Sequence, residues 1–248
     1  MLVDIHAHLD FNDFDVDRSI VIDRAKNVGV SFVICNGVDI ASNKKILSLS
    51  KKFSLIRPAF GLYPLDVVKL SKKNVDKTFD FIEKHVDDCV AFGEIGLDYT
   101  DNLHIDKQKE VLLRFFDLAK KYDKPVILHS RKAESDVVKL VQESDVKKAV
   151  FHCFSGKFRL VKEIEKLGMY LSIPPIINHS EHFQKIVKEV SLKNLLTETD
   201  SPFLCNVKGE RNEPKNIVFT INKISQILQL DPTEVEKIIF MNAKSIFF

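Results

Sequence analysis

The sequence predicts an α/β fold, a (β/α)₈ TIM barrel with additional C-terminal helices. The chain has 248 residues, close to the roughly 250 residues that are typical of one such barrel. Short apolar runs alternate with longer segments of helical period, as expected when crossover helices connect parallel strands. No low-complexity or Pro/Gly-rich run divides the chain, so we expect residues 1–248 to form a single domain.

Eight segments have the length and composition of buried parallel strands. Runs such as VSFVIC and KPVILHS place apolar residues at consecutive positions, which a sheet covered on both faces requires. The predicted strands are residues 1–9, 30–38, 55–62, 90–97, 125–130, 149–154, 169–173 and 195–199. Eight such units suggest closure into a barrel, although the same periodicity also fits an open, doubly wound sheet.

The segments between the strands have the period of amphipathic helices, for example residues 105–122 and 158–167. A long tail follows the last predicted strand and contains two more helical segments, residues 214–228 and 232–246. Asp231 and Pro232 have the residue types that favour a helix cap and a first turn. We therefore expect the barrel to be followed by extra C-terminal helices.

The composition favours a reduced, cytoplasmic protein without a membrane anchor. The four cysteines are far apart, form no C-x-x-C pair and lie in or beside apolar stretches. The apolar N-terminal segment contains Asp4, His6 and His8, which is unlike a signal peptide, and no run of 18 uncharged apolar residues exists. The net charge of +2 gives only weak evidence for a polyanionic partner.

His6 and His8 lie at the end of the first predicted strand, two positions apart. A strand has a side-chain period of two, so both imidazoles point to the same face. In a barrel, the carboxyl end of each strand lies at the mouth of the site. Taken alone, the H-x-H pair fits a metal site or two histidines that bond to loop backbone.

Four other predicted strands end in the same way. Glu94, His129, His152 and Asp200 each follow an apolar run. Burying imidazoles and carboxylates together is costly unless something compensates their charges, and two divalent cations would do so. The mixed nitrogen and oxygen ligand set suits zinc, manganese, iron or cobalt, whereas magnesium prefers more oxygen. The alternative is a buried polar network without metal.

Several residues beside these positions are candidates for substrate contact. A guanidinium suits bidentate contact with a phosphate, so Arg131 and Arg211 are candidates for binding an anionic substrate. The alternative for each arginine is an ion pair, with Glu134 or with Glu210 and Glu213, respectively. Ser155 follows His152 in a flexible segment and could approach a ligand.

Other polar residues have weaker assignments. Asp98 could orient a metal-binding histidine, or it could be a helix cap and loop residue. Glu198 lies two residues before Asp200 and therefore shares its strand face. The remaining histidines lie among charged or polar residues in helical or loop segments, and we expect them to face solvent, with His104 close enough to the mouth to line it. They are His85, His104, His179 and His182.

Six segments together resemble the TatD family of metal-dependent deoxyribonucleases, a branch of the amidohydrolase-like barrels. They are DIHAHLD (4–10), GEIGLDY (93–99), KPVILHSR (124–131), FHCFSG (151–156), TETDSPFL (197–204) and GERNEP (209–214). They occur in the family's order and span nearly the whole chain.

The resemblance implies a specific ligand set and activity. One metal would be bound by His6 and His8, and a second by His129 and His152, with Glu94 bridging and Asp200 completing the cluster. The implied activity is hydrolysis of DNA phosphodiester bonds, commonly as a 3′ exonuclease, on single strands or 3′ ends.

The chain departs from the family's usual pattern at three places. Members often read G-x-H-P-H where this chain has Tyr63 and Leu65 in place of the histidines. Phe115 stands where a glutamine is common, and SIPPII (172–177) replaces a more glycine-rich stretch. These departures leave the substrate and the metal count open.

The expected mechanism is attack on phosphorus by a metal-activated water. Asp200 would be the general base, Glu94 would belong to the catalytic cluster, and Arg131 or Arg211 would neutralise the phosphate. The alternatives are an ester or amide hydrolase on the same scaffold, such as a lactonase or D-aminoacyl-tRNA deacylase, and a noncatalytic binding module. The sequence leaves the oligomeric state open, and a monomer is possible.

Overall fold

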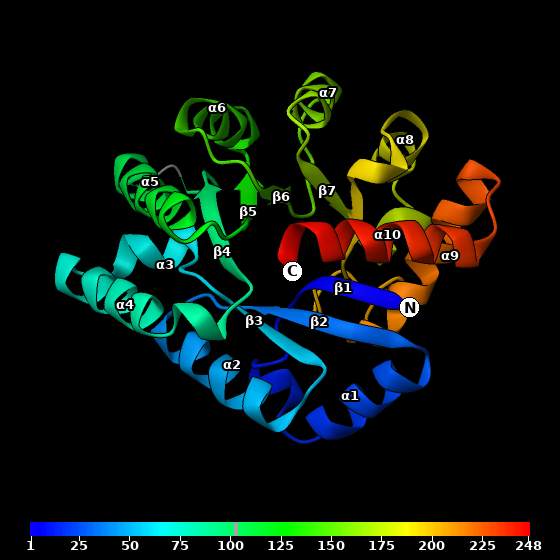
Figure 1. Cartoon of the computed structure of the whole chain (residues 1–248), viewed down its shortest axis with the longest axis horizontal. Coiled ribbons are helices and arrows are strands. Elements are labelled where there is room, and N and C mark those ends of the chain that lie inside the picture. The colour runs from blue at the N-terminus through cyan, green and yellow to red at the C-terminus, as the bar shows by residue number, and fades with distance from the viewer. Residues whose placement is uncertain (102–103) are drawn as a thin grey trace.

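The computed structural model describes residues 1–101 and 104–248, and its centre is a parallel eight-stranded sheet with strand order β1 to β8 (Figure 1). Each strand pairs in parallel with the next one in the chain. The strands are β1 (Leu2–Ala7), β2 (Val30–Asn36), β3 (Ile56–Phe60), β4 (Ala91–Asp98), β5 (Val126–Arg131), β6 (Ala149–Phe151), β7 (Tyr170–Ile173) and β8 (Leu195–Thr197).

The sheet closes where the segment after β8 meets the end of β1. Ala7 and Ser201 form a parallel bridge. The backbone N–H of Asp200 donates to the carbonyl oxygen of His6 at 2.7 Å, and that of His8 donates to Ser201 at 2.8 Å. These contacts confirm the barrel and rule out the open sheet.

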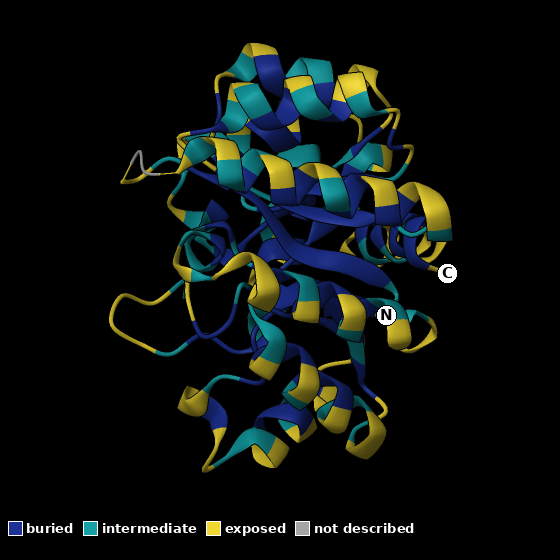
Figure 2. Ribbon diagram, turned by 90° about the vertical axis from the view of Figure 1, so that its left-hand side faces the viewer, coloured by how far each residue is buried: buried dark blue, intermediate teal, exposed yellow. Residues whose placement is uncertain are grey.

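Helices surround the strands. They are α1 (Arg18–Asn27), α2 (Ile40–Lys52), α3 (Pro64–Lys69), α4 (Lys72–Lys84), α5 (Ile105–Tyr122), α6 (Glu134–Ser144), α7 (Phe158–Lys166), α8 (Glu181–Glu189), α9 (Ile217–Leu228) and α10 (Pro232–Phe247). Every residue of β1 and β4 is buried, as the consecutive apolar positions predict. Figure 2 shows the strands in the buried colour between helices with exposed outer faces.

The last two helices lie close to where the sequence predicts them. Residues 214–216 form a short 3₁₀ turn, so α9 begins at Ile217, and Asp231 caps α10 by accepting from the N–H of Thr233. The side-chain amide of Asn242 in α10 donates to the carbonyls of Leu192 and Leu195 at 2.8 Å each. α10 therefore covers the end of the barrel where β8 begins, opposite to the carboxyl ends of the strands.

Several strands are shorter than the apolar runs that predict them. β1 ends at Ala7, β6 at Phe151 and β8 at Thr197, so His8, His152 and Asp200 lie in the segments that follow. Within the described residues, no helix is long and apolar enough to cross a membrane, and all four cysteines are free.

Candidate metal centre

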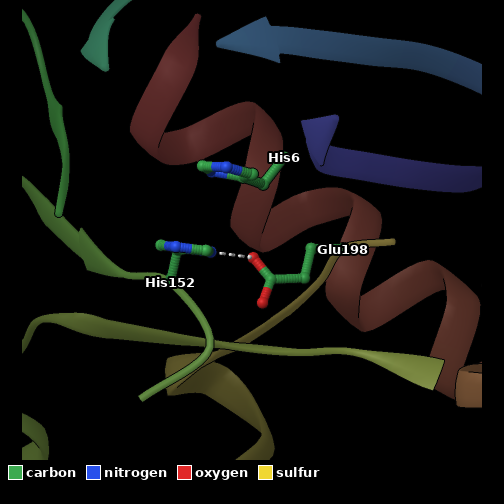
Figure 3. A group of neighbouring side chains, drawn as sticks. All are labelled: His6, His152 and Glu198. Carbon is green, nitrogen blue, oxygen red and sulfur yellow. Dashed lines mark ion pairs between the residues drawn. The ribbon is translucent and has the colours of Figure 1, made fainter. Parts of the chain in front are cut away.

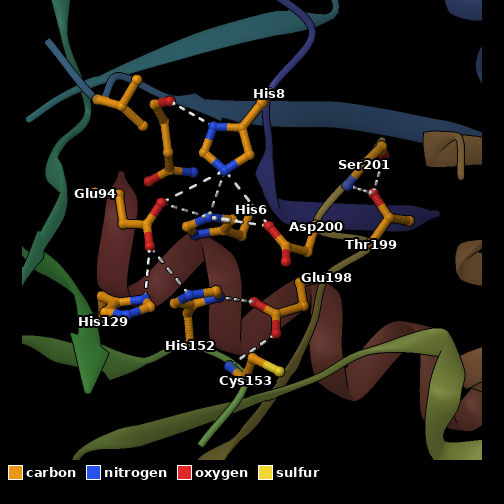
Figure 4. A network of polar contacts seen from close by, with 12 residues as sticks. His6, His8, Glu94, His129, His152, Cys153, Glu198, Thr199, Asp200 and Ser201 are labelled. Carbon is orange, nitrogen blue, oxygen red and sulfur yellow. Dashed lines mark hydrogen bonds and ion pairs between the residues drawn. The ribbon is translucent and has the colours of Figure 1, made fainter. Parts of the chain in front are cut away.

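Six side chains converge at the carboxyl end of the barrel, as Figure 4 shows, and Figure 3 draws two of them, His6 and His152, beside Glu198. The strands or the segments directly after them supply His6, His8, Glu94, His129, His152 and Asp200. All six side chains are largely buried, and the most exposed is that of Asp200, at 14%. The structure thus brings together the residues that the strand ends indicate.

The six side chains form two groups of three that share no residue, and a third group, His6, His152 and Glu198, overlaps both. His6, His8 and Asp200 form one group, and Glu94, His129 and His152 form the other. In each group the candidate ligand atoms lie within 4.8 Å of one another. This division fits two ions.

The carboxylate of Glu94 faces both groups. Its Oε2 lies 3.5 Å from Nε2 of His6 and 3.5 Å from Nε2 of His8. Its Oε1 lies 2.9 Å from Nδ1 of His129 and 3.3 Å from Nε2 of His152. A carboxylate with one oxygen directed to each group is suited to bridge two cations.

The donor set itself fits divalent cations. The Nε2 atoms of His6 and His8 are only 3.2 Å apart, and the rings of His6 and His152 stack with centroids 3.9 Å apart. Nitrogen lone pairs and carboxylate oxygens crowded in a buried space need a compensating charge, which a cation provides. Imidazole suits zinc and iron, and the two carboxylates extend the set toward metals that prefer oxygen, such as manganese.

Neighbouring acceptors orient two of the imidazoles. The Nδ1 atom of His8 lies 3.0 Å from the carbonyl oxygen of Asn36. The Nε2 atom of His129 lies 3.0 Å from Oδ2 of Asp98. Each contact places the ring proton on the outer nitrogen and leaves the lone pair of the other nitrogen directed at the cluster.

Glu198 orients His152. Its Oε2 lies 3.4 Å from Nδ1 of His152, and Figure 3 shows this contact beside the stacked ring of His6. The two oxygens of Glu198 also accept hydrogen bonds from the N–H of Cys153 at 2.8 Å and the hydroxyl of Ser172 at 2.6 Å. Because both oxygens are already engaged, we assign Glu198 to positioning His152 and not to binding an ion.

Tyr63 lies behind the second group, at a position where the family often has histidine. Its hydroxyl donates to Oδ2 of Asp98 at 3.0 Å and lies 3.4 Å from Nε2 of His129. The other oxygen of Asp98 accepts from the N–H of Thr100 at 2.8 Å. Burial and the nearby charges of Glu94 and Asp98 raise the pKa of Tyr63 well above its ordinary value, so the phenol stays protonated and can donate.

The electrostatics keep both carboxylates charged. Burial opposes ionisation of Glu94, but hydrogen bonds with His129, His152 and His6 hold its pKa well below the ordinary value. Burial also opposes ionisation of Asp200, whose pKa is lowered by the hydrogen bond with His8.

The same contacts raise the pKa of the neighbouring imidazoles, with one exception. Burial opposes the charged form of His8, but the hydrogen bond with Asp200 and the charge of Glu94 raise its pKa to about 9. His152 likewise has a raised pKa despite burial, because Glu198 and Glu94 are close. His6 is the exception, since burial lowers its pKa. Without cations, protons therefore compensate part of the negative charge.

The cluster opens into a pocket of about 930 Å³. Among the described residues, Arg131 is the only lysine or arginine that lines it. Arg131 is exposed and forms no ion pair with another described residue, so the alternative pairing with Glu134 is not present. Glu134 instead accepts from the hydroxyl of Ser155 at 3.2 Å, and Ser155 also lines the pocket.

Arg211 lies outside the pocket. Its guanidinium forms hydrogen bonds of 2.9 and 2.6 Å with the carboxylate of Asp17 and one of 3.2 Å with Glu213. The group also lies over the ring of Phe14, at 4.7 Å from its centroid. These partners correspond to the ion-pair alternative for Arg211, because the loop folds back toward the start of α1.

Sequence reasoning missed part of the pocket wall. His182 was expected to face solvent, but it is half-buried, lines the pocket and contacts the carbonyl oxygen of Phe154 at 3.0 Å. The expectation was wrong because the first turn of α8 lies at the mouth. Phe11 and Phe203 also line the pocket, and their only signal is a place three residues after His8 and Asp200, respectively. His104 and His179 are exposed, as expected.

Comparison with known proteins agrees with this site. The model of the family described as TatD related DNase matches residues 3–248. The chain belongs to the TatD-related DNase family. It is a metal-dependent hydrolase of that family.

Named TatD-family relatives cover nearly the whole chain. An uncharacterised metal-dependent hydrolase of Methanocaldococcus jannaschii is 34% identical over 99% of this chain and 96% of its own length. Human deoxyribonuclease TATDN3 is 33% identical over 99% of this chain and 94% of its own length. The crystal structure of the TatD homologue YjjV from Escherichia coli superposes with a TM-score of 0.92 at 26% identity, covering 99% of this chain and 97% of that one.

Metal binding should release protons. His8 has a pKa of about 9, so at neutral pH its imidazole carries a proton that an incoming cation must displace. We expect the apparent affinity for zinc or manganese to rise with pH and to level off above about pH 9. Calorimetric titration in buffers with different ionisation enthalpies measures the protons released. An affinity that is constant from pH 6 to pH 9, with no proton release, would contradict the charge state assigned to the cluster.

Removing the Tyr63 hydroxyl should weaken binding of the second ion. Tyr63→Phe takes away one of the donors that hold Asp98 against His129. In a metal titration, we expect about ten-fold weaker binding at one of two sites. Losing a partner that orients a metal ligand weakens metal binding by about 10- to 100-fold, and Tyr63 acts through Asp98, so we expect the lower value.

A matched control is Tyr99→Phe. The hydroxyl of Tyr99 donates to Asp136 at 2.7 Å, so this change also removes a phenol–carboxylate hydrogen bond but leaves the cluster intact. Equal effects of the two changes on metal affinity would show that Tyr63 has no specific role in holding His129.

Proposed function

We propose that this protein is a TatD-like deoxyribonuclease that cleaves DNA phosphodiester bonds and prefers single strands or 3′ ends. The observation that carries the proposal is the pair of ligand groups joined by Glu94 at the base of a pocket that contains Arg131. Two cations held side by side by these groups would stabilise the attacking and the leaving oxygen of a phosphoryl transfer. The name of the human relative supports DNA as the substrate.

The chain's own residues would hold two divalent ions. His6, His8 and Asp200 would bind one, His129 and His152 would bind the other, and Glu94 would contact both. Bound there, the ions would lower the pKa of a water molecule and offset the charge of the phosphate. Zinc, manganese and magnesium are the candidates, and the nitrogen-rich set favours the first two.

Asp200 has the position and the charge state of a general base. Its Oδ1 lies 3.5 Å from His6 and 3.4 Å from His8, while 14% of the side chain stays exposed toward the pocket. Its lowered pKa keeps the carboxylate deprotonated at neutral pH, as a proton acceptor requires. Asp200 would take the proton of the attacking water.

Arg131 would contact the nonbridging oxygens of the phosphate. The base of the pocket contains the carboxylates of Glu94 and Asp200, which repel an anion unless cations compensate them. A free guanidinium at the rim can form two hydrogen bonds with a phosphate. Arg211 has no part in this proposal because Asp17 and Glu213 occupy its guanidinium.

A substrate panel tests the proposed activity. Single-stranded and duplex oligodeoxynucleotides labelled at the 5′ end are incubated with zinc, manganese or magnesium, and the products are separated by length. We expect stepwise shortening from the 3′ end that a chelator abolishes. A lactone and a D-aminoacyl ester are included because the fold and the metal centre alone do not choose between these substrates. Turnover of one of these esters, with no cleavage of DNA under any metal, would replace the proposal with its alternative.

Replacing the general base should abolish turnover and preserve the fold. We expect Asp200→Asn to lower the rate by about 100- to 10,000-fold, with partial metal binding retained. The control is Asp145→Asn, because Asp145 has a φ of 60° and Asp200 a φ of 56°, so both changes occur in the left-handed region. Asp145 is far from the cluster and pairs with Lys147. Wild-type turnover in Asp200→Asn would refute the assigned role.

A further inference from the structure

Phe203 exposes a large aromatic surface inside the pocket. Its relative exposure is 51%, whereas Phe14, Phe60 and Phe92 are fully buried. The segment that carries it also contains Asp200, so the exposed ring lies next to the cluster. An exposed aromatic ring in a pocket is a common mark of ligand contact.

Phe203 and Phe11 contact each other edge to face beside a candidate metal ligand. The ring of Phe11 stacks on that of His8, with centroids 4.8 Å apart and an interplanar angle of 24°. The ring of Phe203 stands edge-on to both, with its centroid 6.0 Å from that of Phe11 at 79° and 6.3 Å from that of His8 at 64°. We call Phe11 and Phe203 the aromatic shelf.

The backbone fixes the shelf relative to the cluster. The N–H of Phe11 donates to the carbonyl oxygen of His8 at 3.1 Å, and the N–H of Phe203 donates to that of Asp200 at 2.8 Å. Each ring thus stands three residues after a cluster residue, at the far end of a hydrogen-bonded turn. The turns fix the backbone from which both rings project beside the cluster.

The shelf and Arg131 lie on different sides of the cluster. The shelf follows β1 and β8, which are neighbours across the closure of the barrel, whereas Arg131 ends β5, on the far side of the strand order. A substrate that spans the pocket would meet an aromatic surface on one side and a cation on the other. A nucleotide has these two features, a flat base and an anionic phosphate.

Building on the proposed nuclease function, we propose that the exposed ring of Phe203, supported by Phe11 in the aromatic shelf, stacks against the nucleobase adjacent to the scissile phosphate. Every base presents a π face, so stacking selects unstacked nucleotides with little regard to sequence. Leu204, which also lines the pocket, extends the apolar surface beside Phe203. The enzyme therefore favours single strands and frayed ends, because a base inside a duplex is covered on both faces.

The test compares a normal single strand with one that carries abasic residues at its 3′ end. Phe203→Leu keeps an apolar side chain but removes the π surface, and Phe203→Tyr keeps the ring. We expect Phe203→Leu to lower kcat/KM for the normal strand about ten-fold and to leave kcat/KM for the abasic strand unchanged. Phe203→Tyr should cleave both strands as the wild type does. Phe219→Leu is the matched control, since Phe219 is 41% exposed on α9 and does not line the pocket.

Two outcomes overturn the shelf. One is an equal loss for both strands in Phe203→Leu, which would assign the ring to packing or to general apolar contact. The other is equal cleavage of both strands by the unaltered enzyme.

A binding measurement separates the shelf from the nuclease activity. Anisotropy of a labelled strand is recorded with metal-loaded Asp200→Asn, which should bind DNA without cutting it. Phe203→Leu in this background should weaken binding of the normal strand about ten-fold. If no DNA is cleaved under any metal, the nuclease proposal fails by itself. Unchanged binding on loss of the ring would then overturn the shelf as well.

Discussion

The position of the Glu94 carboxylate between two groups of imidazoles is the constraint on which the rest of the site depends. Glu94 lies in a strand that packs very closely against both neighbours. A Cβ at Gly61 would lie 2.4 Å from the carbonyl oxygen of Glu94, and a Cβ at Gly96 would lie 2.0 Å from that of His129. Glycine at both positions lets the backbones approach, and this approach brings Oε1 of Glu94 to 2.9 Å from His129.

The closure of the barrel completes the other half of the cluster. The N–H of Asp200 donates to the carbonyl oxygen of His6, so β1 and the segment after β8 meet where each carries a candidate metal ligand. The same segment then turns and places Phe203 in the pocket. The proposed general base and the proposed base-stacking surface are therefore one structural unit, and a shift of the closure would move both together.

Much of this arrangement follows from the sequence because strand periodicity and strand ends are local properties. An apolar run that ends in His6 and His8, or in His129, indicates which end of the barrel holds the polar groups. The direction of the chain beyond a strand is not local. Arg211 and His182 lie in such segments, and the sequence alone could not show that one folds back onto Asp17 or that the other lies at the mouth. For the same reason, the place of Phe203 three residues after Asp200 could not show that its ring is exposed in the pocket.

The hydroxyl of Tyr63 is engaged by Asp98 and not directed at a substrate. A phenol has a single proton, and Tyr63 gives it to Asp98, an ionised carboxylate that can only accept. Tyr63 therefore has no proton left for a phosphate oxygen, whereas a protonated histidine at this place would have a second donor. In the proposed reaction the phosphate would therefore depend on Arg131, the only lysine or arginine lining the pocket within the described residues. In this chain Tyr63 instead supports His129 through Asp98, and so acts on the candidate metal site.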